Sequence, residues 1–246
     1  MVMWDENPPY MPLPIVTYSI IIINFIVFFL TYLILPQAGI PPDEVIHEFG
    51  LIPADVLSGY RLYTIITSMF LHAGLSHILG NMFYLYVFGD NVEAALGRKR
   101  FIILYFASGL GASLFHLMSN TIISPFQAFE ALKRQGITPW EIPAVGASGA
   151  ISGVLGAYLL LFPRAQLKGV TIIGVFPVLV ELPASAYIII WFLFQLIYAI
   201  ASLGAGLSAG IAFWAHIGGF VTGLALTPYL VDRERLRKLY LRVPSI

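Results

Sequence analysis

Four polar residues of types that take part in acyl transfer lie within apolar stretches of this 246-residue chain. Ser148 lies in AVGASGAISGVLGAY, His216 lies in WAHIGGFVTG, and His77 and Asn81 lie in HAGLSHILGN. Polar side chains at membrane depth are costly in free energy, so they usually face the interior of a helix bundle or a cavity. Each of the four is therefore a candidate functional residue.

The chemistry that these residue types support is nucleophilic catalysis by serine. A serine hydroxyl is a poor nucleophile until a base removes its proton, and neutral histidine does this near neutral pH. The tetrahedral intermediate of acyl transfer needs donors for its oxyanion, and the Asn81 amide, a His77 ring N–H and the Ser148 backbone N–H are candidates. No Asp or Glu lies at the matching depth of any expected span. We therefore expect a dyad of Ser148 and His216 without a third member, and no metal or other cofactor.

The composition is that of a polytopic membrane protein. The chain is 59% hydrophobic and only 11% charged, whereas soluble domains have about 25% charged residues. A formal net charge of zero gives no case for binding nucleic acid. The absence of cysteine excludes thiol catalysis and cysteine-bound metals.

Six apolar stretches are long enough to be membrane spans, since a helix crosses the hydrocarbon core with about 20 residues. We therefore expect an all-α membrane protein with a long outer loop after the first span. The six spans are expected at 15–35, 71–89, 101–118, 142–162, 183–201 and 207–230. A further apolar run at 169–180 is too short to span, and we expect it to be interfacial or re-entrant.

The basic residues indicate the orientation. Arg61, Lys133 and Arg134 follow odd-numbered spans, whereas all other Lys and Arg residues follow spans two, four and six. By the positive-inside rule both termini are cytoplasmic, and we expect the cell membrane. Spans two, four and six then all begin at the outer surface, which places the polar residues in one layer below it. In the outer loops we expect partly helical structure at 36–70 and a short amphipathic helix, PFQAFEALKRQG, within 119–141.

Small-residue stripes predict that spans four and six touch. Such stripes let helix backbones approach closely in lipid, and packing them together would bring His216 beside Ser148. The stripes are Gly149, Gly153 and Gly156 on span four and Gly219 and Gly223 on span six.

Structural roles compete with these interpretations. A serine in a membrane helix often bonds back to the carbonyl four residues earlier, which is our interpretation of Ser152. A lone intramembrane histidine is as often structural as functional, and we interpret His72 and His116 as structural or surface residues. Glu93 is most simply a helix-end partner for Arg98 or Arg100.

Three motifs together resemble the rhomboid intramembrane serine proteases. Gly146-Ala147-Ser148-Gly149 resembles their G-x-S-G motif, and Ala215-His216-Ile217-Gly218-Gly219 followed by Gly223 resembles their A-H-x-x-G-x-x-x-G motif. His77-x-x-x-Asn81 resembles their second-span H-x-x-x-N motif. The resemblance covers roughly 49–230, and the order and spacing of the motifs agree with the family.

The resemblance implies a single rhomboid-like bundle of six spans over 1–246 that cuts the transmembrane segments of other proteins within the bilayer. It implies that Ser148 is the nucleophile, that His216 is the general base and acid, and that His77, Asn81 and the Ser148 N–H form the oxyanion hole. It also implies that the first outer loop lies partly in the membrane and that span five and 202–210 control access. The helix-packing glycines at the site would be Gly146, Gly149, Gly153, Gly219 and Gly223.

Two positions depart from the family pattern. Tyr60-Arg61 stands where many relatives have Trp-Arg, and Ser152 stands where some have an aromatic residue that flanks the histidine. Two other classes of protein compete with a protease. An inactive rhomboid-like binding protein is disfavoured by the intact dyad. A small-solute transporter would have inverted repeats and polar groups at the midplane, and neither is found.

Overall fold

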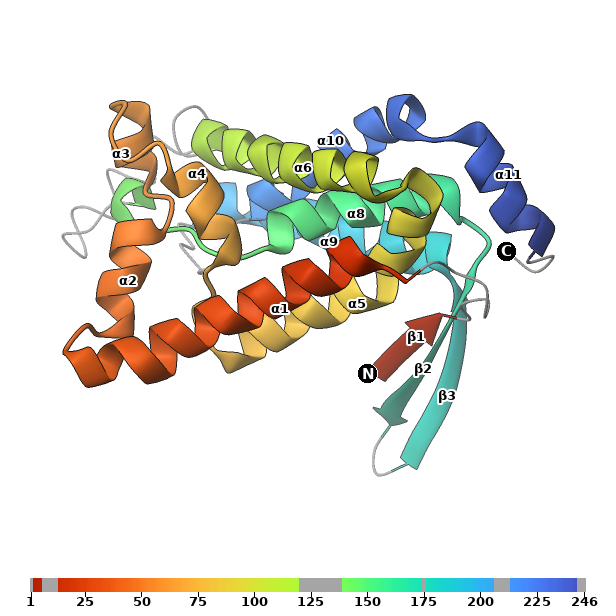
Figure 1. Ribbon diagram of the computed structural model, residues 1–246, viewed down its shortest axis with the longest axis horizontal. Helices are drawn as coiled ribbons and strands as arrows, with labels where there is room; N and C mark the ends of the chain where they lie inside the picture. The colour runs from red at the N-terminus through yellow and green to blue at the C-terminus, as the bar shows by residue number, and fades with distance from the viewer. Residues whose placement is uncertain (1, 6–12, 120–138, 174–175, 206–212, 243–246) are drawn as a thin grey trace.

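The computed structural model describes residues 2–5, 13–119, 139–173, 176–205 and 213–242 (Figure 1). These residues are mostly helical, as expected, and each of the six expected ranges contains a helix. The six are α1 (Ile15–Phe29), α5 (Leu75–Leu96), α6 (Arg98–Met118), α8 (Ser148–Leu161), α9 (Ala184–Ala205) and α10 (Phe213–Leu230).

Three helical segments of the described chain are long and apolar enough to cross a membrane by themselves. They are Ile15–Ala38, in which α1 continues through the π-helix η1 (Leu30–Ile34) and the 3-10 helix η2 (Leu35–Ala38), together with Arg98–Met118 and Ala184–Ser202. The count of six spans therefore stays a prediction.

The helix boundaries differ from the expected ones in α5, α8 and α9. α5 continues to Leu96, beyond the expected end at 89. α8 begins at Ser148, because 142–146 is not helical and Ala147 is the residue that caps the helix. α9 continues to Ala205, beyond the expected break at Ser202. The rest of that break, 206–210, and the expected amphipathic helix PFQAFEALKRQG lie outside the described residues.

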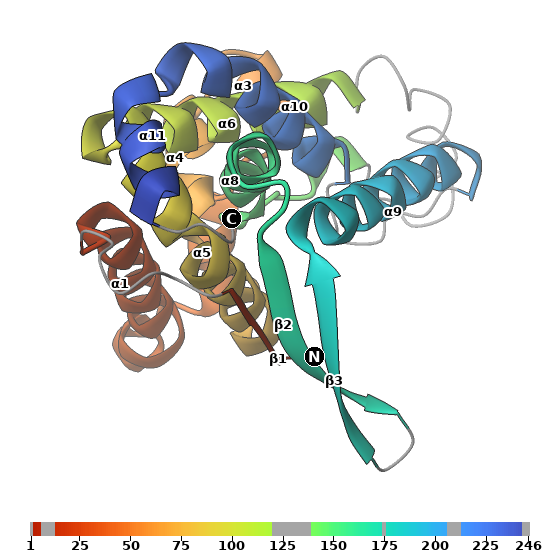
Figure 2. The same cartoon turned by 90° about the vertical axis from the view of Figure 1, so that its right-hand side faces the viewer.

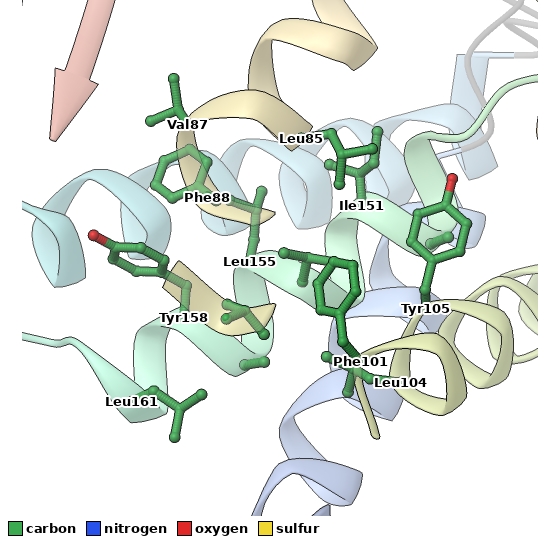
Figure 3. Close-up of a cluster of buried hydrophobic side chains, with 14 of the residues drawn as sticks. Leu85, Val87, Phe88, Phe101, Leu104, Tyr105, Ile151, Leu155, Tyr158 and Leu161 are labelled. Carbon is green, nitrogen blue, oxygen red and sulfur yellow. The ribbon is translucent and has the colours of Figure 1, made fainter. Parts of the chain in front are cut away.

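Helix α8 is the centre of the bundle. Figure 2 shows it nearly end-on, with α5, α6, α9 and α10 arranged around it. Its small and apolar residues are almost all buried, so protein and not lipid surrounds it. Figure 3 shows the core around the C-terminal half of α8, where Leu155 and Tyr158 meet Phe88 of α5 and Phe101 of α6. The rings of Phe88 and Tyr158 pack edge to face with their centroids 5.0 Å apart.

Glu93 holds the beginning of α1 against α5, which corrects our interpretation of this residue. α1 is preceded by Pro14, which gives it no side-chain cap. The Glu93 carboxylate accepts hydrogen bonds from the Val16 N–H (3.0 Å), the Thr17 N–H (2.8 Å) and the Thr17 hydroxyl (2.8 Å). Glu93 is buried, so it is not an exposed partner of Arg98 or Arg100. The free N–H groups at a helix start attract an anion, which explains why a carboxylate lies here.

A three-stranded antiparallel sheet projects from one end of the bundle (Figures 1 and 2). It consists of β1 (Val2–Asp5), β2 (Gln166–Ile173) and β3 (Phe176–Pro183), in the order β1-β2-β3. The apolar run at 169–180 was expected to be interfacial or re-entrant, and the fold was expected to be purely helical. A re-entrant helix is corrected, because this β-branched run forms paired strands, whereas an interfacial location stays a prediction. The described residues are mostly helical, as the all-α class predicts, and the sheet is an addition to them. Lys168 lies opposite Glu181 in the register, with 3.5 Å between Nζ and Oε1.

Short helices fill the segment between α1 and α5. They are α2 (Pro42–Phe49), α3 (Pro53–Leu57), α4 (Thr64–Thr67) and the 3-10 turn η3 (Ser68–Phe70). Arg61 joins them: its guanidinium lies 2.6 Å from Glu48 Oε2 and 3.6 Å from Asp55 Oδ2, and it donates to the His47 carbonyl. Together with the 3-10 turn η5 (Pro139–Glu141), these helices lie at the end of the bundle opposite the sheet (Figure 1).

The last helix, α11 (Arg233–Arg242), is anchored by Asp232 at its start. Asp232 Oδ1 accepts from the backbone N–H groups of Glu234 and Arg235, and its Oδ2 lies 3.3 Å from Arg100 at the start of α6. The hydrogen bond from the Arg235 N–H and the nearby Arg100 hold the pKa of Asp232 below its usual value.

We expect Glu93→Gln to lower the free energy of unfolding by roughly 2 kcal/mol, because it replaces charge-assisted bonds by weaker ones at a buried helix start. The measurement is thermal unfolding in detergent micelles. The matched control is Glu234→Gln, which removes an exposed pair with Lys238 and should change the stability by less than about 0.5 kcal/mol. Equal stability of Glu93→Gln and the unsubstituted protein would contradict the role of Glu93.

Candidate active site

Ser148 is the first residue of α8, and the residues before it fix its position. Gly146 has φ +128°, a conformation that favours glycine, and its N–H donates to the Ser68 carbonyl at 2.9 Å. Two residues earlier, Ala144 forms a two-way backbone bridge with Leu51. The segment that leads to Ser148 is therefore tied to the loop between α1 and α5. Ser148 itself is half-buried.

His216 on α10 lies in hydrogen-bond contact with Ser148. Its Nε2 is 2.8 Å from Ser148 Oγ, although 68 residues separate the two in sequence. This is the distance expected between a nucleophile and the base that takes its proton. The predicted pairing of these two residues is thus present in the geometry.

The contact depends on the close approach of α8 and α10. A Cβ atom added to Gly219 would lie 1.9 Å from the Gly149 carbonyl oxygen, and one added to Gly223 would lie 2.1 Å from that of Gly153. A Cβ on Gly156 would lie 2.6 Å from the Phe220 carbonyl oxygen. No side chain fits between the two helices along this line, so the backbones themselves are in contact.

Gly149 and Gly153 also face α6. A Cβ on Gly149 would lie 2.4 Å from that of Ala112, and one on Gly153 would lie 2.0 Å from the Ser108 hydroxyl. Both glycines are therefore packed on two sides, which makes α8 a helix that tolerates no added side chain at these positions.

His77 and Asn81 approach the site from α5. His77 Nδ1 accepts a hydrogen bond from the Ala73 N–H at 3.3 Å, which places the proton of the neutral ring on Nε2. That Nε2 is directed at Gly146, where a Cβ would lie only 2.8 Å from it. Asn81 is buried, and its amide donates to the His77 carbonyl of the same helix at 3.1 Å. One amide N–H of Asn81 remains for another acceptor.

Two residues of α9 that the sequence did not single out contact His216. Gln195 Oε1 lies 2.8 Å from His216 Nδ1, and the rings of Trp191 and His216 have their centroids 6.1 Å apart. Trp191 therefore stands in for the aromatic residue that is absent at Ser152. Gln195 was detectable as one of the few polar side chains of an apolar span, but its direction within the bundle was not.

The other polar residues near the site have structural contacts. Ser152 donates to the Ser148 carbonyl at 2.7 Å, which confirms its interpretation as a packing residue. His72 is buried, with its ring edge to face against that of His77 at 5.0 Å. Among the described residues there is no group of three His, Cys, Asp or Glu side chains that would hold a metal ion.

Comparison with known proteins gives consistent matches. The Rhomboid domain family matches residues 59–233, well over half of the chain. RHOMBOID-like protein 12 of Arabidopsis thaliana, named as mitochondrial, is 36% identical over 120 residues, which are 48% of this chain and 34% of that protein. Rhomboid protein 1 of Saccharomyces cerevisiae, also named as mitochondrial, is 33% identical over 180 residues, 72% of this chain and 45% of that protein.

A bacterial protein is also similar. Rhomboid protease GluP of Bacillus subtilis is 29% identical over 146 residues, which are 59% of this chain and 24% of that protein. The match spans less than half the length of each of these three relatives.

We expect Gly219→Ala to separate Ser148 from His216 and to destabilise the fold by about 1–3 kcal/mol, because the added methyl group overlaps the Gly149 carbonyl. The measurements are thermal unfolding and the rate at which a serine-directed fluorophosphonate labels Ser148. The matched control is Gly80→Ala on α5, where a Cβ meets nothing within 4 Å. Labelling of Gly219→Ala at the unsubstituted rate would show that the contact is not needed.

Proposed function

The chain belongs to the rhomboid family, and from this premise we propose that it is an intramembrane serine endopeptidase. It is an integral membrane protein, and its proposed substrates are other membrane proteins, cut in or near their transmembrane segments. The single observation that carries the proposal is the 2.8 Å contact between Ser148 Oγ, at the start of α8, and His216 Nε2 on α10 of an apolar bundle.

The proposed reaction is a two-step acyl transfer. His216 Nε2 takes the hydroxyl proton of Ser148 while Oγ attacks the carbonyl carbon of the substrate peptide. The imidazolium then gives this proton to the leaving amine as the C–N bond breaks, which leaves an ester on Ser148. Water repeats the sequence: His216 takes one proton from it, and the hydroxide adds to the ester carbon. The bond between this carbon and Ser148 Oγ then breaks, Oγ takes the proton back from His216, and the carboxyl product leaves.

The proposed oxyanion hole consists of three donors from α5 and α8. The His77 tautomer supports this role, since its Nδ1 is occupied by the Ala73 N–H and its Nε2–H is directed at the approach to Ser148. Asn81 contributes its second amide N–H, and Ser148 contributes a backbone N–H at the start of α8, where such groups have no partner within the helix. The three donors are held on rigid elements before substrate arrives, which is the condition for effective stabilisation of the transition state.

The length of α8 supports a site below the membrane surface. Its 14 residues make a helix of about 21 Å, shorter than the hydrocarbon core of roughly 30 Å. A helix of the substrate hides its carbonyl groups in hydrogen bonds, so the substrate must unwind locally to reach Ser148. Glycine or proline near the bond that is cut favours this step.

The proposed orientation follows the basic residues, with both termini on the cytoplasmic side. The expectation of the cell membrane has no support from the relatives, since two of the three reported above are named as mitochondrial. In the proposed orientation, the end of the bundle that carries Ser148 faces the outer side of the membrane, whichever membrane this is.

We expect a serine-directed fluorophosphonate to label the purified protein, and Ser148→Ala and His216→Ala to lose both labelling and cleavage of a transmembrane substrate. The measurement is gel fluorescence together with mass spectrometry of the cleavage site. The matched control is Ser152→Ala, which removes a hydroxyl from the same helix and should retain activity. A chelator should change nothing. Cleavage that survives Ser148→Ala would overturn the proposed function.

We expect Asn81→Ala to lower kcat by roughly 10²–10³, the typical effect of removing one oxyanion donor. The matched control is Asn24→Ala. The Asn24 amide also donates to the carbonyl four residues earlier, but Asn24 lies on α1, outside the proposed site. Both variants lose the same kind of bond within a helix, so only the oxyanion role separates their kinetics. Equal kcat values for the two folded variants would remove Asn81 from the site.

A further inference from the structure

We infer that Gln195 is a positioning residue that holds His216 in the tautomer needed for catalysis. The inference rests on the proposed function, because it concerns the base of that reaction. It goes beyond a Ser–His dyad, since it adds a third side chain, from α9, which contacts the ring nitrogen of His216 that does not face Ser148.

Both ring nitrogens of His216 are engaged. Nε2 faces Ser148 Oγ at 2.8 Å, and Nδ1 faces Gln195 Oε1 at 2.8 Å. A neutral imidazole carries one proton, and the hydrogen bond at one nitrogen decides which nitrogen has it. If an oxygen acceptor lies at Nδ1, the proton stays there and Nε2 has the free electron pair that a base requires.

The orientation of the Gln195 amide is itself fixed by a hydrogen bond. Its Nε2 lies 3.4 Å from the Trp191 carbonyl, one turn earlier on α9, and donates to it. The amide oxygen is therefore the atom turned to His216, in the assignment that satisfies both contacts. The Trp191 ring beside His216 limits the rotation of the imidazole on the same side.

A neutral acceptor suits this location. A carboxylate opposite His216 would orient the ring equally well, but burying an ionised group in a bilayer costs free energy even when it is paired. The Gln195 oxygen supplies the orientation without adding a charge. When His216 takes the Ser148 proton, the same oxygen accepts from the imidazolium Nδ1–H, so the bond persists through the reaction.

A purely structural role for Gln195 is the competing explanation, since a glutamine in a helix often bonds to its own backbone. Gln37 does this at the end of the first helical segment, where its amide donates to the Leu33 carbonyl at 2.9 Å and, among the described residues, makes no hydrogen bond to a histidine. Gln37→Leu is therefore a matched control for Gln195→Leu: both lose a bond within a helix, but only one loses an acceptor for His216.

The test compares Gln195→Leu, Gln195→Glu and Gln37→Leu in cleavage and in fluorophosphonate labelling. For Gln195→Leu we expect kcat and the labelling rate to fall about tenfold, the loss of one hydrogen bond to a charged group, with KM unchanged. Gln195→Glu keeps an oxygen acceptor on a side chain of the same length in either protonation state, so it should restore most of the rate. Gln37→Leu should match the unsubstituted protein.

Two results would overturn the inference. One is labelling of Gln195→Leu at the unsubstituted rate. The other is an equal loss in Gln195→Leu and Gln195→Glu, which would mean that packing and not the acceptor matters. A failure of the proposed function is a separate outcome, because it requires cleavage to survive Ser148→Ala.

A measurement on the unsubstituted protein decides the matter if Gln195→Leu does not fold. In protein labelled with ¹⁵N-histidine, with His216→Gln used to assign the signals, the neutral His216 ring should carry its proton on Nδ1. A ring protonated on Nε2 would overturn the inference.

Discussion

Direct contact between the backbones of α8 and α10 is the constraint on which the site depends. In lipid no hydrophobic force draws two apolar helices together, so close packing must hold them. At Gly149 and Gly219 both helices carry glycine, so no side-chain atom of these two residues separates the backbones. The distance between Ser148 and His216 is therefore set by two backbones, which are stiffer than any pair of side chains. α6 packs against Gly153 as well, through Ser108, so a third helix supports the contact between the other two.

Polar contacts position the remaining elements around this pair. The buried Glu93 holds α1 on α5, and the backbone bonds of Ala144 and Gly146 tie the approach to Ser148 to the preceding loop. Arg61 in turn organises that loop through Glu48. Each of these contacts satisfies groups that water would otherwise solvate, which is why they lie at the ends of helices, where backbone groups have no partner within the helix. Between these ends the helices meet mainly by packing, with a few side-chain bonds such as that between the Tyr84 hydroxyl of α5 and the Tyr187 hydroxyl of α9.

The sequence predicted the contact between Ser148 and His216 because the spacing of residues along a helix indicates which of them share a face. His216 lies three residues before Gly219, so the stripe and the histidine share one face, and the contact of α8 with α10 followed. Gln195 and Trp191 were missed because α9 has no such stripe to indicate which of its faces turns inward. The strands β2 and β3 were missed because an apolar run of that length has no unique structure without its partner β1. Glu93 was misassigned because its interpretation considered only arginines close to it in sequence. Its actual partners, at the start of α1, are more than 70 residues away.

The junction of β3 with α9 gives the helix a pivot. α9 follows β3 without an intervening residue, and the Ala184 N–H is bonded to the Ala165 carbonyl. Gln195 lies eleven residues farther on, about 16 Å along the helix axis. A tilt of about 10° around this pivot would move Gln195 by about 3 Å, enough to break a hydrogen bond that tolerates only a few tenths of an ångström. A small rotation of α9 would therefore change the orientation of His216, the proposed base, through its bond to Gln195.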